Sequence, residues 1–398
     1  MIKEEQQQII IKKRCEFDDS VQKHHTLWKL CREIILQLVE YTDSKFWDKP
    51  DILVMFNLEF VHILISEFDV NPENITFTSD SEGRRNFAEK ILRVNILEDN
   101  LFELMRKDKV GENIMKKQFD VILGNPPYHK KRDKEDTKTQ AIWQDFVELS
   151  FKVCKKNGYI CLVHPSGWRG NGMYNKVGNK IKSHQVEYLE MHDEKDGMKI
   201  FKAETRYDWY VIKNCPNINN TTIKDQKGII SEINIKNMEI IPNFKISIVQ
   251  NLFDKDGEDK VEILADSSYH TQSGFKKGFM SEEKTEKFKY PCVYVVNFKG
   301  KIKLWYSSVR KEHFGISKLI FSNGRISSAN YFIDKKGEYG LTQFSYGIID
   351  ESSNFENIYK AMRTKEFKEV MEACSIGMLS INKDVLRLFR KDFWKEFV

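Results

Sequence analysis

The residues best suited to chemistry in this chain are four in a row, Asn125-Pro126-Pro127-Tyr128. An apolar, strand-like run ends at Gly124 and leads directly into them. Each proline fixes φ near about −65° and lacks an N–H, and Asn125, which precedes a proline, is pushed toward an extended backbone. We therefore predict a stiff rim that presents one amide side chain, one backbone carbonyl and one aromatic ring.

Such a rim suits an amino group on a flat aromatic ring. The lone pair of an aromatic amine is delocalised into the ring, so the nitrogen is a weak nucleophile. Acceptors aimed at its two hydrogens would favour a tetrahedral nitrogen and free the lone pair, and the Asn125 side-chain oxygen and the Pro126 carbonyl could be those acceptors. Tyr128 could stack on the ring, a contact worth roughly 1–3 kcal/mol. The structural alternative is a Pro-Pro turn that ends a strand, with Tyr128 packed inward.

The elements that must position this rim alternate along the chain between apolar runs and helical patterns. The predicted strands are 51–56, 75–79, 94–97, 121–123 and 159–164, and the predicted helices are 24–41, 60–65, 81–92 and 139–155. This alternation predicts an α/β fold with a doubly wound, Rossmann-like parallel sheet. Ligands of such sheets bind at the carboxyl ends of the strands. Asp80, Asp99 and Asn125 each follow a predicted strand.

The segment from Phe119 to Tyr128, Phe-Asp-Val-Ile-Leu-Gly-Asn-Pro-Pro-Tyr, resembles the catalytic motif of N6-adenine DNA methyltransferases, especially those of restriction–modification systems. Other segments resemble further parts of the same catalytic domain, in family order: 75–80, 96–101, 143–149, 158–169 and 205–213. The resemblance covers roughly residues 50–215. Cofactor strands that precede the catalytic loop resemble the γ arrangement of these enzymes.

The resemblance implies transfer of a methyl group from S-adenosylmethionine to the N6 amine of adenine in double-stranded DNA, with the base flipped into a cleft. Asn125 and Pro126 would orient the amine, Pro127 would complete the catalytic rim, and Tyr128 would stack on the base. The nitrogen would attack the methyl directly, so neither a covalent enzyme intermediate nor a metal is expected.

The cofactor is expected at the ends of the first three strands. Asp80 could accept the ribose hydroxyl protons or cap the following helix, and Asp99 could hold the adenine amino group or be an exposed loop acid. The family normally has a glycine-rich turn after strand one, where glycines let the backbone approach the cofactor, but 54–61 contains no glycine. Asn57 and Glu59 could supply polar contacts instead, or be bystanders in a closed pocket.

Basic and aromatic residues near the predicted site and in the second domain are expected to contact DNA. They are Lys130, Lys131 and Arg132 in a charged loop, Trp168 and Arg169 in a glycine-punctuated turn, and Arg325 in the second domain. Residues 274–279 are a further candidate. The alternatives are an ordinary solvated loop for the first three and a tryptophan-anchored turn for the next two.

The residue composition of the sequence changes at about residue 216. We expect a methyltransferase catalytic domain with N-terminal helices over 1–215, and a mixed α+β target-recognition domain over 216–398. Residues 216–398 hold 29 Lys and Arg against 24 Asp and Glu, so the formal net charge of +5 lies entirely in this part. That distribution suits a domain that follows phosphates.

Two other classes of function remain open. One is a cofactor-deficient, DNA-binding subunit that works only with a partner chain, and the other is a methyltransferase for RNA adenine or protein glutamine, which use similar rims. The sequence leaves open whether the chain assembles with a partner subunit or forms a homodimer. Seven scattered cysteines without metal-ligand spacing predict a reducing, cytoplasmic setting and no structural metal. No apolar stretch approaches about 18 residues, so no membrane span is expected, and the polar first residues predict no signal peptide.

Overall fold

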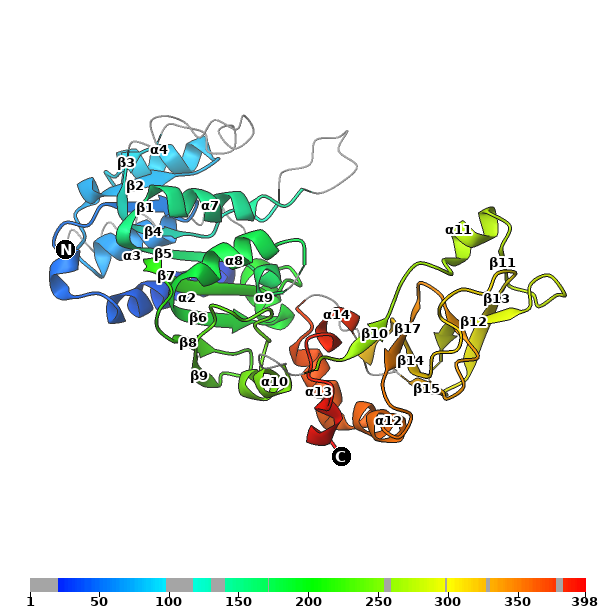
Figure 1. The fold of residues 1–398 in the computed structure, drawn as a ribbon. Helices are drawn as coiled ribbons and strands as arrows, with labels where there is room; N and C mark the ends of the chain where they lie inside the picture. The colour runs from blue at the N-terminus through cyan, green and yellow to red at the C-terminus, as the bar shows by residue number, and fades with distance from the viewer. Residues whose placement is uncertain are drawn as a thin grey trace. The chain divides into compact units, whose positions relative to one another are not determined.

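The computed structural model describes residues 21–97, 117–129, 140–170, 172–253, 259–297, 299–326, 330–376 and 382–398. The chain divides into two compact units, Met1–Ile241 and Pro242–Val398 (Figure 1). The change of composition at residue 216 does not coincide with this boundary, because two strands that follow residue 216 still belong to the sheet of the first unit. No helix in the described ranges is long and apolar enough to cross a membrane.

The first unit is built on one nine-stranded sheet. In spatial order its strands are β3 (Asn95–Ile96), β2 (Ile75–Thr78), β1 (Ile52–Met55), β4 (Phe119–Gly124), β5 (Cys154–Pro165), β7 (Tyr207–Pro216), β6 (His184–His192), β8 (Thr221–Lys224) and β9 (Ile230–Ile233). The first five run parallel to one another, whereas β7 is antiparallel to both β5 and β6. The α/β sheet with parallel strands is therefore present, and its second half is mixed.

Helices lie along both faces of this sheet (Figure 1). They are α2 (Val21–Glu40), α3 (Leu58–Ser66), α4 (Glu82–Lys90), α7 (Trp143–Val153), α8 (Asn175–Ser183) and α9 (Glu194–Phe201), with short 3-10 turns η1 (Ser44–Trp47), η2 (Pro72–Asn74) and η3 (Ser166–Arg169). All four residues of β1 are buried, as expected for a central parallel strand covered on both faces. One core contains Ile34 of α2, Phe60 of α3 and Trp209 of β7.

The order of the strands reverses at β1. The chain passes from β1 to β2 and β3 on one side, and then returns to β4 on the other side of β1. Met55, the last residue of β1, pairs with Gly124, the last residue of β4. A Cβ on Gly124 would lie 3.0 Å from the Met55 carbonyl oxygen, so glycine permits the close approach of these two strand ends. Ligands of open α/β sheets bind at such a reversal.

The second unit contains two four-stranded sheets. One has the order β10 (Glu262–Leu264), β17 (Ser345–Ile349), β14 (Lys318–Ser322), β15 (Tyr331–Asp334), and the other has the order β11 (Met280–Ser281), β13 (Ile302–Ser307), β12 (Tyr290–Val296), β16 (Gly340–Leu341). Its helices are α10 (Ile246–Leu252), α11 (Thr271–Lys276), α12 (Phe355–Arg363), α13 (Lys365–Ala373) and α14 (Lys383–Leu386), followed by η5 (Phe393–Glu396). The content is mixed α+β, whereas the role of target recognition stays a prediction.

Candidate functional site

One edge of the large sheet gathers the residues that could do chemistry. Register pairs link the end of β4 to β5, the end of β5 to the start of β7, and the start of β7 to the end of β6. Because β7 runs in the opposite direction, its first residues lie at the same edge as the last residues of β1, β4, β5 and β6. We call this edge the carboxyl edge. It carries Asn125 to Tyr128, the turn η3, Tyr207, Asp208 and His192.

The Asn125-Pro-Pro-Tyr rim leaves β4 at the strand reversal. Asn125 is half-buried and Pro126 is buried. Among the described residues, no group is hydrogen-bonded to the Asn125 side chain, and no donor is hydrogen-bonded to the Pro126 carbonyl. Two acceptors that need donors therefore lie on consecutive residues, at the place where an open α/β sheet binds its ligands.

Tyr128 is held at both its backbone and its ring. Its carbonyl accepts a hydrogen bond from the Ile142 N–H at 3.0 Å, and its ring meets Phe201 edge to face at a centroid distance of 6.0 Å. The hydroxyl is buried and has no hydrogen-bond partner in the described part of the chain. Burial, together with the nearby carboxylate of Asp208, raises the pKa of Tyr128 far above its ordinary value. The residue as a whole is half-buried, so part of it is packed and part remains accessible.

The turn after β5 is anchored by one buried carboxylate. Trp168 Nε1 and Arg169 Nε donate to the same Asp208 oxygen at 2.9 and 2.8 Å, and Arg169 also donates to the Ile241 carbonyl at 2.9 Å. All three charged or aromatic side chains are 0% exposed. Burial raises the pKa of Asp208 even though the Arg169 guanidinium opposes that shift. The second Asp208 oxygen has no hydrogen-bond partner among the described residues.

This burial corrects the expectation that Trp168 and Arg169 contact DNA. A side chain without accessible surface cannot reach a nucleic acid in this conformation, and the tryptophan-anchored turn is what the structure contains. Sequence reasoning also missed Asp208. The available signal was a single acid inside the apolar run of β7, since a buried carboxylate requires hydrogen-bond donors.

The turn after β1 adopts a glycine-like backbone without a glycine. Phe56 has φ of 72°, in the left-handed region, and its ring meets Phe146 edge to face at 5.1 Å. Its N–H donates to the Thr78 carbonyl at 2.8 Å, which ties the turn to β2. Asn57 is buried at the N-terminus of α3 and makes no capping bond, and Glu59 is buried in the first turn of that helix.

Asp80 follows β2 at the carboxyl edge and is exposed. The cap of α4 is Ser81, whose side chain accepts from the Arg84 N–H at 3.4 Å. Asp80 is therefore not the N-cap of α4. Arg325 is exposed after β14 in the second unit. Four other residues singled out by the sequence lie outside the described residues: Asp99, Lys130, Lys131 and Arg132.

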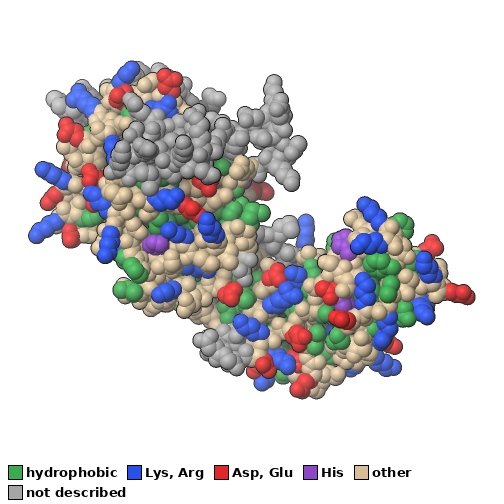
Figure 2. Space-filling view, turned by 45° about the horizontal axis from the view of Figure 1, so that its top comes forward, with side chains coloured by type: hydrophobic (Ala, Val, Ile, Leu, Met, Phe, Trp, Pro, Cys, Tyr) green, Lys and Arg blue, Asp and Glu red, His purple; other side chains and the backbone are tan. Residues whose placement is uncertain are grey.

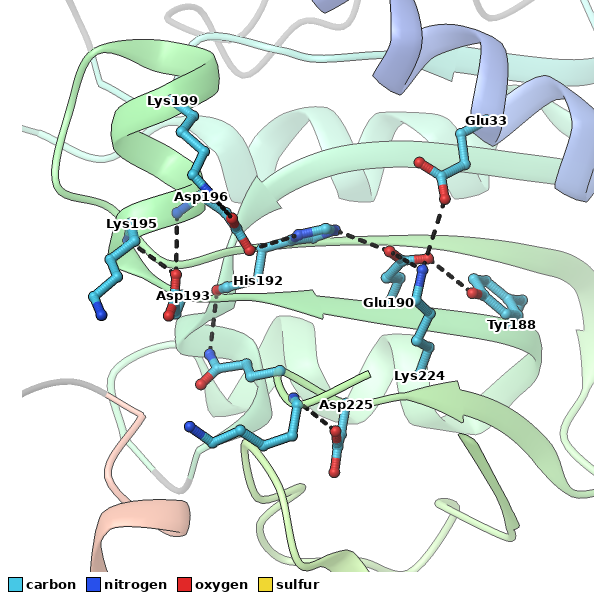
Figure 3. A network of polar contacts seen from close by, with 12 residues as sticks. Glu33, Tyr188, Glu190, His192, Asp193, Lys195, Asp196, Lys199, Lys224 and Asp225 are labelled. Atoms are coloured by element: carbon cyan, nitrogen blue, oxygen red, sulfur yellow. Dashed lines mark hydrogen bonds and ion pairs between the residues drawn. The ribbon is translucent and has the colours of Figure 1, made fainter. Parts of the chain in front are cut away.

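A network of charged side chains extends the carboxyl edge along β6 (Figure 3). His192 lies 3.4 Å from both Glu190 and Asp196, and Glu190 also contacts Lys224 at 2.9 Å. Burial alone would raise the pKa of Glu190, but the nearby His192 ring and hydrogen bonds from Lys224 and Tyr188 hold it below its ordinary value. Sequence reasoning did not single out this cluster, since its members come from separate elements.

The network reaches the rim through aromatic rings. His192 stacks on Tyr207 at 4.4 Å with an interplanar angle of 4°. Tyr207 in turn meets Phe201 edge to face at 5.0 Å, and Phe201 is the ring against Tyr128. The packed side of Tyr128 is therefore continuous with a charged cluster on β6, α9 and β8.

One family model matches part of the first unit. Residues 53–201 match the family model described as Eco57I restriction-modification methylase. No curated protein matches the chain in sequence. The matched segment contains β1, the Asn-Pro-Pro-Tyr rim and the buried turn after β5.

Solved structures that resemble the chain include methyltransferases and restriction enzymes. The type IIG restriction endonuclease BpuSI has a TM-score of 0.43 and 9% identity, over 94% of this chain and 60% of that one. A Listeria monocytogenes protein described as a class I S-adenosylmethionine-dependent methyltransferase has a TM-score of 0.38 and 12% identity, over 55% and 71%. The methyltransferase subunit of a type I restriction–modification system from Streptococcus thermophilus has a TM-score of 0.33 and 14% identity, over 48% and 46%. The chain thus spans less than two thirds of two of these three proteins.

Proposed function

We propose that this chain transfers a methyl group from S-adenosylmethionine to the N6 amine of adenine in DNA. The observation that carries the proposal is the rim at the end of β4, where the Asn125 amide and the Pro126 carbonyl have no described partner beside the strand reversal. The match of residues 53–201 to a restriction–modification methylase family supports the same chemistry.

The rim acts by orienting an amine. The Asn125 side-chain oxygen and the Pro126 carbonyl each accept one hydrogen of the N6 group, which turns the nitrogen lone pair toward the methyl donor. Tyr128 stacks on the flipped base, while Phe201 supports the Tyr128 ring edge to face. S-adenosylmethionine supplies the methyl group on a positively charged sulfur.

The residues at the ends of β1 and β2 fit that donor. A left-handed residue after β1 reproduces the backbone path that a glycine would give, and the Phe56 ring is buried against Phe146 rather than standing at the carboxyl edge. Asp80 is exposed, follows β2 and does not cap α4. It would accept the ribose hydroxyl protons, and Asn57 would supply an amide beside them. Glu59 and Asp99 remain candidates for further polar contacts.

Double-stranded DNA is the proposed substrate, and the second unit is proposed to recognise the target. Arg325 is exposed there and would contact the duplex, together with Lys130, Lys131 and Arg132 beside the rim. Trp168 and Arg169 take no part in these contacts and instead hold the turn at the carboxyl edge. A partner subunit would be required if the chain does not bind its target alone.

Product analysis tests the proposal. Incubation with tritiated S-adenosylmethionine and DNA of mixed sequence, followed by digestion to nucleosides, should place the label in N6-methyladenine. Label in another nucleoside would contradict the adenine assignment, and label only in RNA or in protein would favour the corresponding other substrate.

A cofactor-deficient subunit is the second candidate, and the glycine-free turn at Phe56 favours it. A phenylalanine in the left-handed region costs of order 1–3 kcal/mol. The packing of the Phe56 ring can offset this strain even if the turn binds no cofactor. Titration calorimetry with S-adenosylmethionine separates the two candidates. The enzyme binds the cofactor when DNA is present, whereas a deficient subunit gives no heat of binding with or without DNA.

A further inference from the structure

The positive charge of the chain is concentrated in one stretch of the second unit. Residues 270–312 contain ten Lys and Arg and four Asp and Glu, a formal charge of +6, whereas the whole chain carries +5. The rest of the molecule is therefore close to neutral. Nine of the ten basic side chains are exposed. Figure 2 shows Lys and Arg side chains beside hydrophobic ones over the second unit.

Three aromatic side chains gather within reach of this charge. Tyr294 on β12 lies nearly parallel to Trp305 on β13, with centroids 6.2 Å apart and an angle of 25°. Phe344, which is 41% exposed, meets Tyr294 edge to face at 5.1 Å. The Lys303 ammonium lies 5.4 Å from the centre of the Tyr294 ring. We call these four residues the Tyr294 patch.

The patch exists because the sheet is only partly covered on that face. Val293 packs with Ile320 in the core on one face. On the other face Cys292 packs with Tyr269 and Met280, and Trp305 touches that small core from its margin. The register shift at Val293/Val295 sets Tyr294 outside the regular pairing of β12 with β13. Tyr294 is thereby left half-buried beside an exposed lysine.

We propose that the Tyr294 patch binds single-stranded nucleic acid. Unpaired bases would stack on Tyr294 and Phe344, with Trp305 supporting the platform, and Lys303 with the surrounding basic residues would neutralise phosphates. Aromatic side chains in a basic setting are the arrangement that binds unpaired bases, because every base offers a π-face whatever its sequence. This inference does not depend on methyl transfer.

Unpaired bases match the patch better than a duplex does. The base faces of a duplex are covered by neighbouring pairs, and its exposed base edges are read by hydrogen-bonding side chains. The aromatic members of the Tyr294 patch offer mainly ring surface, since Phe344 has no hydrogen-bonding group, Trp305 Nε1 is buried and Tyr294 has a single hydroxyl. The local charge of +6 also disfavours a basic protein segment as the occupant.

Fluorescence anisotropy with the full chain tests the proposal in the absence of S-adenosylmethionine. The probe is a labelled single-stranded oligonucleotide of mixed sequence, and the comparison is the same oligonucleotide in a duplex. The single strand should bind, and its affinity should depend on the patch residues more strongly than that of the duplex, because the proposed duplex contacts lie outside the patch. Tyr294→Ala and Phe344→Ala should each weaken single-strand binding by about fivefold or more, the loss expected for one stacked base. Tyr294→Phe should retain the affinity, because the ring and not the hydroxyl is used.

Two matched controls separate stacking and charge from general disturbance. Tyr359→Ala removes an aromatic side chain that is half-buried like Tyr294 but lies on α12, outside the patch and outside residues 270–312, and it should leave binding unchanged. Lys303→Glu should weaken binding and lower its dependence on salt, whereas Lys360→Glu on α12 should do neither.

Unchanged single-strand affinity in both alanine variants that still fold, or an equal loss of duplex affinity in those variants, would overturn the proposal. Because no cofactor is present, a failure of this test leaves the proposed methyl transfer untouched. Conversely, a chain that lacks methyltransferase activity can still bind single-stranded nucleic acid at the Tyr294 patch.

Discussion

Tyr128 has two ends in different surroundings. The residue as a whole is half-buried at the rim, whereas its hydroxyl is buried near Asp208 without a partner in the described part of the chain. Nearby, Asp208 accepts hydrogen bonds from Trp168 and Arg169 on one oxygen and leaves the other without one. The rim is thus supported from behind by polar groups that lack some hydrogen-bond partners among the described residues.

The Tyr128 hydroxyl is expected to be dispensable and the ring essential. A buried polar group without a partner costs about 1–3 kcal/mol, so Tyr128→Phe should raise the free energy of unfolding by about 1 kcal/mol and retain methyl transfer. Tyr128→Ala should abolish turnover and weaken binding of DNA with a mismatched or abasic target pair, where flipping is easy. Urea denaturation and a methyl-transfer assay measure both effects. A Phe variant as damaged in turnover as the Ala variant would contradict the stacking role.

Arg169 is expected to matter for stability rather than for DNA binding. Arg169→Ala leaves Asp208 buried and unpaired, which typically costs about 3–5 kcal/mol. The midpoint of urea denaturation should fall accordingly, while the folded fraction keeps the DNA affinity of the wild type. The exposed Arg325 provides the matched comparison, since Arg325→Ala should weaken DNA binding without a comparable loss of stability. The reverse pattern would restore Arg169 as a DNA contact.

At the scale of elements, the sequence predicts the first half of the sheet well. β1, β2 and β4 are short apolar runs, the predicted strand 159–164 is the apolar part of β5, and α7 is amphipathic, so periodicity identifies them; the polar start of β5 at Cys154 was instead expected to be helical. β8 and β9 were not expected, since four-residue edge strands carry too little pattern, and this moved the boundary from 215 to 241.

The candidate site also has one part that the sequence predicts and another part that it does not. Asn125 to Tyr128 is a local motif that can be recognised in one stretch of sequence. The groups behind it are contributed by distant elements: Asp208 by β7, Phe201 by α9 and His192 by β6. Only the register of β5, β7 and β6 brings them to one edge, and no local pattern encodes that register.

His164 at the end of β5 provides a pH-dependent test of how this edge is packed. It is fully buried, stacks on Trp143 at 4.5 Å and shares a hydrogen bond with the Tyr210 hydroxyl at 2.9 Å. Burial lowers the pKa of His164 from 6.5 to about 4, which the hydrogen bond to the Pro165 carbonyl only partly offsets. The imidazole is therefore neutral in the folded protein while the unfolded chain still takes up a proton.

His164 should make the folded protein less stable as the pH falls. Between about pH 6.5 and pH 4 the unfolded state binds the extra proton, so this group destabilises the fold progressively as the pH falls, by about 3 kcal/mol in total. Urea denaturation at pH 7, 6, 5 and 4 measures it, with His164→Gln as the comparison. The variant should show a flatter loss over this range. Identical pH profiles would show that His164 does not titrate as its burial requires.

At the scale of the whole molecule, two units of different character share one chain. The first contains the carboxyl edge and the match to a restriction–modification methylase family, and the second contains the net positive charge of the chain. The proposed reaction needs both, since a flipped adenine must be supplied to the rim by a DNA-binding part. Binding of cofactor and of DNA should therefore be coupled.

The coupling can be measured by calorimetry. We expect the isolated chain to bind S-adenosylmethionine with a dissociation constant of tens of micromolar or more, about −6 kcal/mol, because residues 54–61 contain no glycine that would let the backbone approach the cofactor. DNA should tighten this binding, and the cofactor should tighten DNA binding by the same factor. Asp80→Ala should weaken cofactor binding further. Nanomolar binding by the chain alone, or indifference to the loss of Asp80, would place the cofactor elsewhere.

The central claim is that the Asn125 amide and the Pro126 carbonyl orient an adenine amine. The most direct measurement is the single-turnover rate of N6-methyladenine formation by Asn125→Ala, with the exposed Asn219→Ala variant as the matched control. We predict that Asn125→Ala loses at least about a hundredfold in rate while folding and DNA binding stay nearly intact, and that the control matches the wild type. A rate for Asn125→Ala within about tenfold of the wild type, or about 1.4 kcal/mol, would contradict the account.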